Sequence, residues 1–178
     1  RSSTVLQLER LSETLPVALD LADLLRPPAV AMFCGHIFLS DPEVELALAL
    51  AIDQAIVEGG VGIGYGAAAS GADILFGERI LAAGGELRLV LPFAEADFIA
   101  ASVAHAGAEW VSRYERVRDR ASGITHATRS DYVNDPGQFA YGADVAMGLA
   151  KLRANRLRTD CIQMAVWDGK ANGVAGTG

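Results

Sequence analysis

The stretch Gly62-Ile-Gly-Tyr-Gly-Ala-Ala-Ala-Ser-Gly-Ala-Asp73 decides the fold of this chain. It places glycines and other small residues between an apolar, strand-like run and an amphipathic helix. Such a junction leaves N–H groups at the helix N-terminus without partners and without bulky side chains over them, and these groups attract anions, above all phosphate. The stretch therefore predicts a strand–loop–helix unit that binds a phosphate-bearing small molecule, with a nucleotide as the expected ligand.

Strand and helix patterns alternate on both sides of this stretch. Short apolar runs predict strands at Ala29–Cys34, Val61–Tyr65, Glu86–Leu91, Ile124–Ala127 and Cys161–Trp167. Helical patterns cover Ser40 to about Glu58, Gly71 to about Ala83, Ala96–Ala104, Ala108–Ala121 and Asp135 to about Arg156. The alternation predicts an α/β fold, a three-layer Rossmann-like parallel sheet of about five strands in order 3-2-1-4-5 with helices on both faces.

The two ends of the chain differ from this regular middle. Residues 1–28 read as a helical lead-in or linker that ends at Arg26-Pro-Pro28, and residues 29–178 as one ligand-binding domain. The first residue is Arg, and we expect a fragment of a larger bacterial multidomain protein. At the first long helix, either Ser40 caps with Glu43 reaching back, or Asp41 caps with Pro42 in the first turn.

Composition narrows the classes of partner. The net charge is −7 and the chain has only two lysines, so the sequence predicts no nucleic-acid polymer as a partner. Charged residues interrupt the longest apolar run, which predicts no membrane span. Cys34 and Cys161 fall in predicted core strands, and we expect buried, reduced thiols in a cytoplasmic protein.

Two motifs carry a resemblance to a known family. Gly66-Ala-Ala-Ala-Ser70-Gly71-Ala72-Asp73 resembles the Ser-Gly-Gly-Ala-x-Gly-Ala/Ile-Asp loop of the SLOG superfamily, which joins DNA-processing protein A to the lonely-guy phosphoribohydrolases. Val166-Trp-Asp-Gly-Lys170 followed by Gly176-Thr177 resembles the W-D-G-K-S-x-G-T segment of several such domains. Over residues 29–178 the chain is identified as a member of this superfamily, which implies a nucleotide pocket closed by the C-terminal tail.

The resemblance does not extend to catalysis. The phosphoribohydrolases carry Pro-Gly-Gly-x-Gly-Thr-x-x-Glu, whereas Asp135-Pro-Gly-Gln-Phe139 keeps only the Pro-Gly start and lacks the glutamate. Catalytic residues are therefore not assigned. The expected function is non-catalytic sensing of a nucleotide or nucleotide-derived phosphate ligand, with signals passed to other domains of the same longer chain. The alternatives are a nucleoside-phosphate or N-glycosidic-bond hydrolase, with Glu78, Glu95, Asp97 or Asp131 as its carboxylate, and a structural module with a vestigial pocket.

The predicted binding residues follow the strands, at the edge of the sheet where parallel folds bind ligands. They are Gly35, His36, Tyr65, Gly66, Ser70, Gly71, Ala72, Asp73, His126, Asp168, Gly169, Lys170 and Thr177. With the strand order given above, His36 and His126 flank the point where the order reverses and could bind phosphate or transfer protons. Asp73 either bonds a ribose hydroxyl or caps its helix. No metal and no obligatory cofactor are expected.

Several side chains at other positions allow two roles each. Phe93 either stacks on a base or packs in the core. Glu95 and Asp97 could act as acid and base, and we favour their role at a helix start. Arg113, Arg116 and Arg120 share one face of a helix with interleaved carboxylates, which favours a solvated charged face over an anion site.

Overall fold

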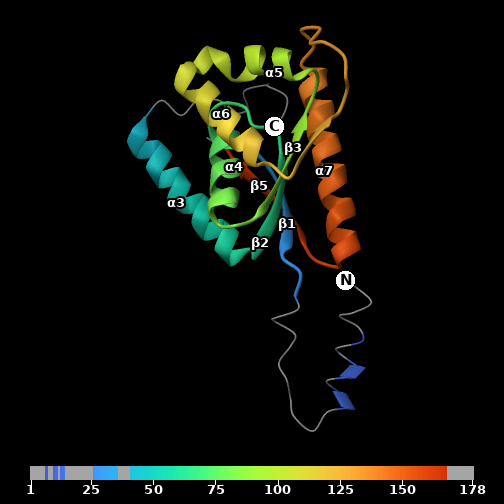
Figure 1. Cartoon of the computed structure of the whole chain (residues 1–178). Coiled ribbons are helices and arrows are strands. Elements are labelled where there is room, and N and C mark those ends of the chain that lie inside the picture. The colour runs from blue at the N-terminus through green and yellow to red at the C-terminus, as the bar shows by residue number, and fades with distance from the viewer. Residues whose placement is uncertain (1–6, 8–9, 12, 15–25, 36–40, 168–178) are drawn as a thin grey trace.

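The computed structural model describes residues 7, 10, 11, 13, 14, 26–35 and 41–167. Five parallel strands form one sheet in the order β4-β3-β2-β1-β5 (Figure 1). The strands are β1 (Ala29–Gly35), β2 (Val61–Gly66), β3 (Glu86–Leu91), β4 (Gly123–His126) and β5 (Cys161–Val166). The helices are α3 (Pro42–Glu58), α4 (Ala72–Ala82), α5 (Glu95–Ser102), the 3-10 turn η1 (Ala104–Ala106), α6 (Ala108–Arg120) and α7 (Gly137–Leu157).

Helices cover both faces of the sheet. Helix α7 packs on β1, β2 and β3 from one side, whereas α4 packs on the same strands from the other side, with α3 and α6 beside it (Figure 1). This arrangement confirms the predicted α/β fold with three layers. Among the described residues, no helix has both the length and the apolar character needed to span a membrane.

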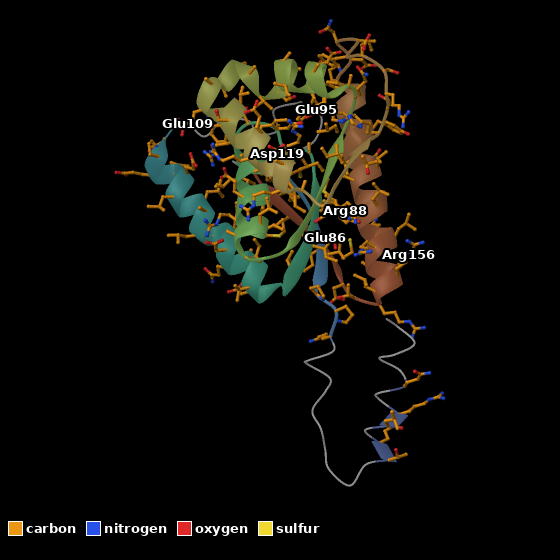
Figure 2. The ribbon with its side chains drawn as sticks, in the orientation of Figure 1. Glu86, Arg88, Glu95, Glu109, Asp119 and Arg156 are labelled. Atoms are coloured by element: carbon orange, nitrogen blue, oxygen red, sulfur yellow. The ribbon has the colours of Figure 1, made fainter. Side chains whose placement is uncertain are left out.

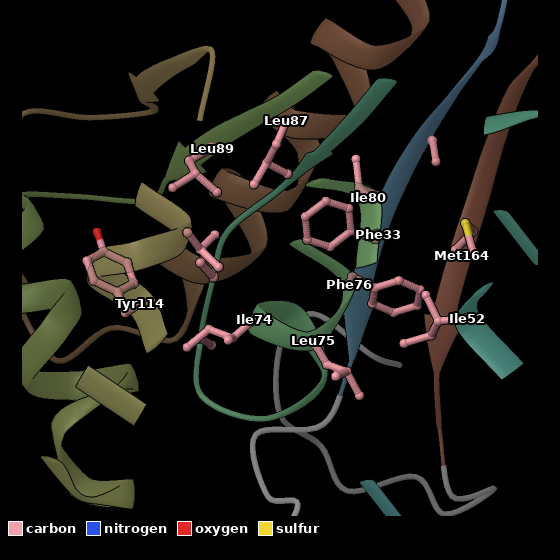
Figure 3. Close-up of a cluster of buried hydrophobic side chains, with 14 of the residues drawn as sticks. Phe33, Ile52, Ile74, Leu75, Phe76, Ile80, Leu87, Leu89, Tyr114 and Met164 are labelled. Carbon is pink, nitrogen blue, oxygen red and sulfur yellow. The ribbon is translucent and has the colours of Figure 1, made fainter. Parts of the chain in front are cut away.

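Successive residues of β1 point to opposite faces and build two separate cores. Ala31 and Phe33 join the larger core with α4 and α6, where Phe33 stacks on Phe76 at 5.4 Å between ring centroids (Figure 3). Val30 and Met32 join the core under α7. There the helix presents small residues, Ala146, Ala150 and Ala154, at every fourth position, which allows its backbone to lie close to the strands.

Local sequence signals set the starts of two helices. The Asp41 carboxylate accepts a hydrogen bond from the Glu43 N–H at 2.9 Å and Pro42 occupies the first turn, so the second of the two capping alternatives is correct. Helix α4 follows Gly71, whose φ of 95° lies in the region that only glycine adopts readily. Both starts follow from residue types that the sequence displays.

The predicted strand order 3-2-1-4-5 is wrong in the position of the fourth strand. Strand β4 lies at the edge of the sheet, pairing with β3 from Arg88↔Gly123 to Leu91↔His126. Helix α7 then crosses the opposite face and delivers β5 to the free side of β1. The order therefore reverses between β1 and β5, and β4 lies three strands from β1.

The edge position of β5 also explains why the predicted burial of one cysteine is wrong. Cys161 is exposed rather than buried, because β5 pairs with β1 only and is covered on fewer sides than a central strand. Cys34, near the end of β1, is partly buried. Most of the predicted lead-in lies outside the described residues, so the division at residue 28 stays a prediction.

Candidate functional site

The loop between β2 and α4 is buried rather than open. Ser70, Ala68 and Ala72 are each 0% exposed. The Ser70 N–H donates a 2.9 Å hydrogen bond to the carbonyl of Ser102, the last residue of α5. The last carbonyls of a helix have no N–H donor within the helix, and the Ser70 N–H of the loop serves as the donor for one of them. The predicted open phosphate cradle is therefore wrong at Ser70, whose backbone donor is already used within the fold.

The fold does bring together the end of β1 and the start of α4. A Cβ added to Gly35 would stand 2.4 Å from the Cβ of Ala72. Only a glycine permits this approach, since real Cβ atoms essentially never come within 3.0 Å of such a neighbour. Gly35, Ala72 and the adjacent Asp73 are thus neighbours, as their shared place at the carboxyl edge of the sheet predicts.

Asp73 is a buried carboxylic acid in the first turn of α4. It is 8% exposed, and its Oδ1 atom has no hydrogen-bond partner among the described residues. Burial raises the pKa of Asp73 from 3.8 to about 7, although the backbone N–H groups of Ala69 and Gly35 act in the opposite direction. Burial, and next the charge of Asp73, raise the pKa of the Cys34 thiol as well.

Tyr65 and His126 lie away from this group. Tyr65 is 6% exposed and packs with Met32 and Ile63 in the core under α7. His126 ends the edge strand β4 and is exposed to solvent. The predicted position of His126 on a strand next to β1 is wrong, because that neighbour is β5. His36, Asp168, Gly169, Lys170 and Thr177 lie outside the described residues, so their predicted binding role stays a prediction.

Charged side chains of β3 and α7 form a network near Tyr65. The Glu86 carboxylate pairs with Arg88 on its own strand at 2.6 Å (Figure 2). It also pairs with Arg153 of α7 at 3.1 Å. Burial raises the pKa of Tyr65, and the two arginines oppose that shift. This network fastens α7 to the sheet and leaves neither arginine without a carboxylate partner.

Arg113 has a structural place that the sequence did not indicate. Its guanidinium pairs with Glu45 of α3 at 2.7 Å and with Glu78 of α4 at 2.6 Å, and lies 4.2 Å from the centre of the Trp110 ring. The prediction that Arg113 belongs to a solvated face is therefore wrong. Glu78, one of the candidate catalytic carboxylates, is occupied by this pairing.

Glu95 and Phe93 are likewise parts of the framework. Glu95, labelled in Figure 2, accepts a 3.0 Å hydrogen bond from the buried Tyr114 hydroxyl. Arg118 lies 3.5 Å from the same carboxylate. Phe93 is 0% exposed, so its role in the core is confirmed. In the described part of the chain, no group of three or more His, Cys, Asp or Glu residues could hold a metal ion.

A second region is the segment from residue 127 to residue 139, named here the aromatic loop, whose cluster of aromatic rings the sequence did not indicate. It joins the carboxyl end of β4 to the first turn of α7. Backbone hydrogen bonds fasten its start to the end of β3: Ala127 N–H donates to Leu91 at 2.8 Å, and both the N–H and the hydroxyl of Thr128 donate to Pro92. The loop is therefore anchored although most of its residues are exposed.

Three aromatic rings hold the middle of the aromatic loop. Phe93 stacks on Tyr132 with centroids 4.6 Å apart and planes 16° apart. Phe139 meets both rings edge-on, at 5.2 Å and 5.4 Å. Phe93 is fully buried, whereas Tyr132 and Phe139 keep part of their surface in solvent. The three rings are far apart in the sequence, so no local sequence pattern predicts that they form a cluster.

The polar groups of the aromatic loop are also fixed. The Tyr132 N–H donates to Asp97 at 2.8 Å, and the Gly137 N–H donates to Asp135 at 2.8 Å, so these two carboxylates already accept backbone hydrogen bonds. Arg129 is exposed and forms no ion pair with any described residue. The loop thus carries an exposed cation and two partly exposed aromatic residues.

Comparison with known proteins gives matches among solved structures only. No family model and no curated protein matches the sequence. DNA processing protein A from Helicobacter pylori, described for its single-stranded DNA binding mode, shares 14% identity with a TM-score of 0.47, over 85% of this chain and 72% of that chain. DNA processing protein A from Streptococcus pneumoniae shares 15% identity with a TM-score of 0.32, over 85% of this chain and 54% of that chain.

These findings correct the expected ligand. The expectations of a small phosphate ligand and of no nucleic-acid partner disagree with what this comparison found, since the Helicobacter pylori protein is described by its single-stranded DNA binding mode. The buried Ser70 loop removes the main structural reason for the small phosphate ligand as well. The fold follows from the chain's own parallel sheet and the helices on its two faces, which make it a Rossmann-like α/β fold.

Proposed function

We propose that this chain binds single-stranded nucleic acid through the aromatic loop. The observation that supports this function is the position of Tyr132. Its ring stacks on Phe93 and meets Phe139 edge-on, its backbone N–H donates to Asp97, and the residue as a whole is partly exposed. A fixed, partly exposed aromatic ring is a stacking platform for an unpaired base, worth about 1–3 kcal/mol per base.

Arg129 supplies the charge that this mode of binding needs. It lies three residues before Tyr132, is exposed, and has no carboxylate partner among the described residues. In this proposal the Arg129 guanidinium, which belongs to the same loop, pairs with a phosphate of the bound strand. Tyr141, which is 50% exposed in the first turns of α7, offers a second aromatic surface nearby in sequence.

The net charge of the chain determines how tightly we expect it to bind single-stranded nucleic acid. A net charge of −7 opposes the approach of any polyanion, so few phosphates are contacted. We expect a dissociation constant on the order of 10–100 μM at low salt and a shallow salt dependence, about −0.7 in log–log slope for each phosphate contacted. Stacking rather than charge then supplies most of the affinity.

The test is fluorescence anisotropy with a labelled oligothymidylate of about 15 nucleotides, long enough for one binding site. Tyr132→Leu keeps an apolar contact with Phe93 but removes the platform, and should raise the dissociation constant about tenfold. Arg129→Ala should raise it a few-fold and reduce the salt slope by about 0.7.

Arg116→Ala is the matched control, since Arg116 is also exposed and has no ion pair among the described residues. It should leave binding unchanged. An equal loss of affinity in Arg116→Ala and Arg129→Ala would show that the oligonucleotide is bound only by nonspecific charge attraction. No anisotropy change up to about 100 μM protein would end the proposal.

A further inference from the structure

The outer face of α3 carries exposed apolar side chains, and no described helix or strand covers it. Four of the ten exposed large hydrophobic side chains of the described residues lie on this one helix. Leu46, Leu50 and Val57 are 64%, 62% and 79% exposed, while Ile52 and Ile56 on the inner face are 3% and 4% exposed. Figure 1 shows α3 as the outermost helix on its side of the sheet, with no described element packed outside it.

The exposed side chains have the spacing of a helix-packing stripe. Leu46, Leu50 and Val57 are separated by four and seven residues, which places them on one line along the helix. Ala47, which is exposed and lies three residues before Leu50, is next to this line and small enough for another helix backbone to approach closely. An apolar stripe of this kind on the surface of a folded domain marks an interaction surface.

The charges of α3 define which kind of helix fits. Every charged residue of α3 is acidic. Asp53 pairs with Arg79, and Glu45 pairs with Arg113, so these two are neutralised by neighbouring helices. Glu43 and Glu58 form no ion pair with any described residue, and both are exposed. They stand at the two ends of the stripe, about 22 Å apart along the helix.

We infer that the outer face of α3 is a docking site for an amphipathic helix of a partner protein whose apolar stripe is flanked by basic residues. A second copy of this chain fits less well, because pairing α3 with itself brings Glu43 and Glu58 against glutamates in either direction. Lysine or arginine at both ends of a helix of about four turns would instead meet opposite charges.

The test uses a labelled synthetic helix of about three heptads with leucine at the a and d positions and lysine at the flanking positions. A second peptide with glutamate at the flanking positions is its charge control. The lysine peptide should bind at least about tenfold more tightly than the glutamate peptide. Glu43→Gln with Glu58→Gln should reduce that preference several-fold.

Leu46→Gln with Leu50→Gln should weaken binding of the lysine peptide about tenfold, and Val57→Gln alone should weaken it as well. Leu152→Gln is the matched control, since Leu152 is 63% exposed on α7. Because all these side chains are exposed, circular dichroism should show an unchanged fold.

Three results would overturn the inference. The first is binding by the Leu46→Gln, Leu50→Gln protein equal to that of the unmodified protein. The second is an equal loss with Leu152→Gln. The third is a dimer in sedimentation experiments that the α3 substitutions abolish and that excludes the peptide, because the occupant would then be a second copy.

Discussion

Arg113 and Glu78 form a two-point ion pair that joins α6 to α4. The Arg113 Nε donates to Glu78 Oε1 at 2.9 Å, and its Nη2 donates to Oε2 at 2.6 Å. The remaining Nη1 reaches Glu45 of α3 at 2.7 Å. One side chain therefore fastens three helices on the same face of the sheet, in the fork geometry that arginine makes with carboxylates.

Replacing Arg113 by Ala should destabilise the protein by about 2–3 kcal/mol. The loss leaves two carboxylates, each about 28–29% exposed, close together without a counter-charge. That exposure keeps the cost below that of a fully buried pair. Urea unfolding followed by circular dichroism measures the change. Arg116→Ala, on the outer side of the same helix, should stay within about 0.5 kcal/mol, and equal effects would contradict a specific role for Arg113.

Replacing Gly35 by Ala should destabilise the protein by about 1–3 kcal/mol. The new methyl group would stand 2.4 Å from the Cβ of Ala72 and 3.1 Å from that of Val166, so the end of β1 and the start of α4 must separate. Gly148→Ala is the matched control, since nothing lies within 4 Å of the added Cβ on α7. It should stabilise the helix by about 0.5–1 kcal/mol. In thermal unfolding, Gly35→Ala should lower the melting temperature and Gly148→Ala should raise it.

Replacing Asp73 by Asn should change how stability depends on pH. Because burial raises the pKa of Asp73 from 3.8 to about 7, the folded state holds a proton that the unfolded chain releases. The free energy of unfolding therefore falls as pH rises from about 4 to about 7. Above that range the contribution of Asp73 to the free energy of unfolding no longer changes with pH.

The Asp73→Asn protein is compared with the unmodified protein at several pH values, because the amide stays neutral throughout. Asp73→Asn should be more stable by about 2–4 kcal/mol at pH about 8, and the difference should vanish near pH 4. Denaturant unfolding at pH about 4, 6 and 8 measures it. A constant difference at all three values would show that Asp73 does not titrate in this range.

Replacing Tyr114 by Phe should cost about 1 kcal/mol. The hydroxyl of Tyr114 is buried and donates to Glu95 at 3.0 Å, and burial together with the Glu95 charge raises the pKa of Tyr114. Tyr141→Phe, at a side chain that is 50% exposed, should be neutral. A Tyr114→Phe protein with an unchanged urea midpoint would mean that water replaces the lost hydrogen bond without cost.

The sequence predicted the helices and strands because their signals are local. The Asp41-Pro42 start of α3 and the Gly71 start of α4 depend on residues within one turn of the helix end. The buried strands β2 and β3 are short apolar runs between glycines and charges. Each of these elements was therefore predicted to within a few residues of its bounds.

The sites were predicted less well because burial is not local. Ser70 lies in a glycine-rich loop, yet the end of α5, about thirty residues later, covers it and uses its N–H. Arg113 has the helical spacing of a solvated residue, but two carboxylates from other helices surround it. The ring cluster of the aromatic loop was not predicted, because Phe93, Tyr132 and Phe139 come into contact only when β3 and β4 pair.

The sequence by itself determined the alternation of strands and helices, the helix starts and the α/β class, since periodicity and capping act between residues a few positions apart. The tertiary structure alone decided that β4 lies beside β3, that β5 pairs with β1 and that the Ser70 loop is covered. These outcomes depend on which surfaces pack together across the whole chain, and no segment of the sequence carries that information alone.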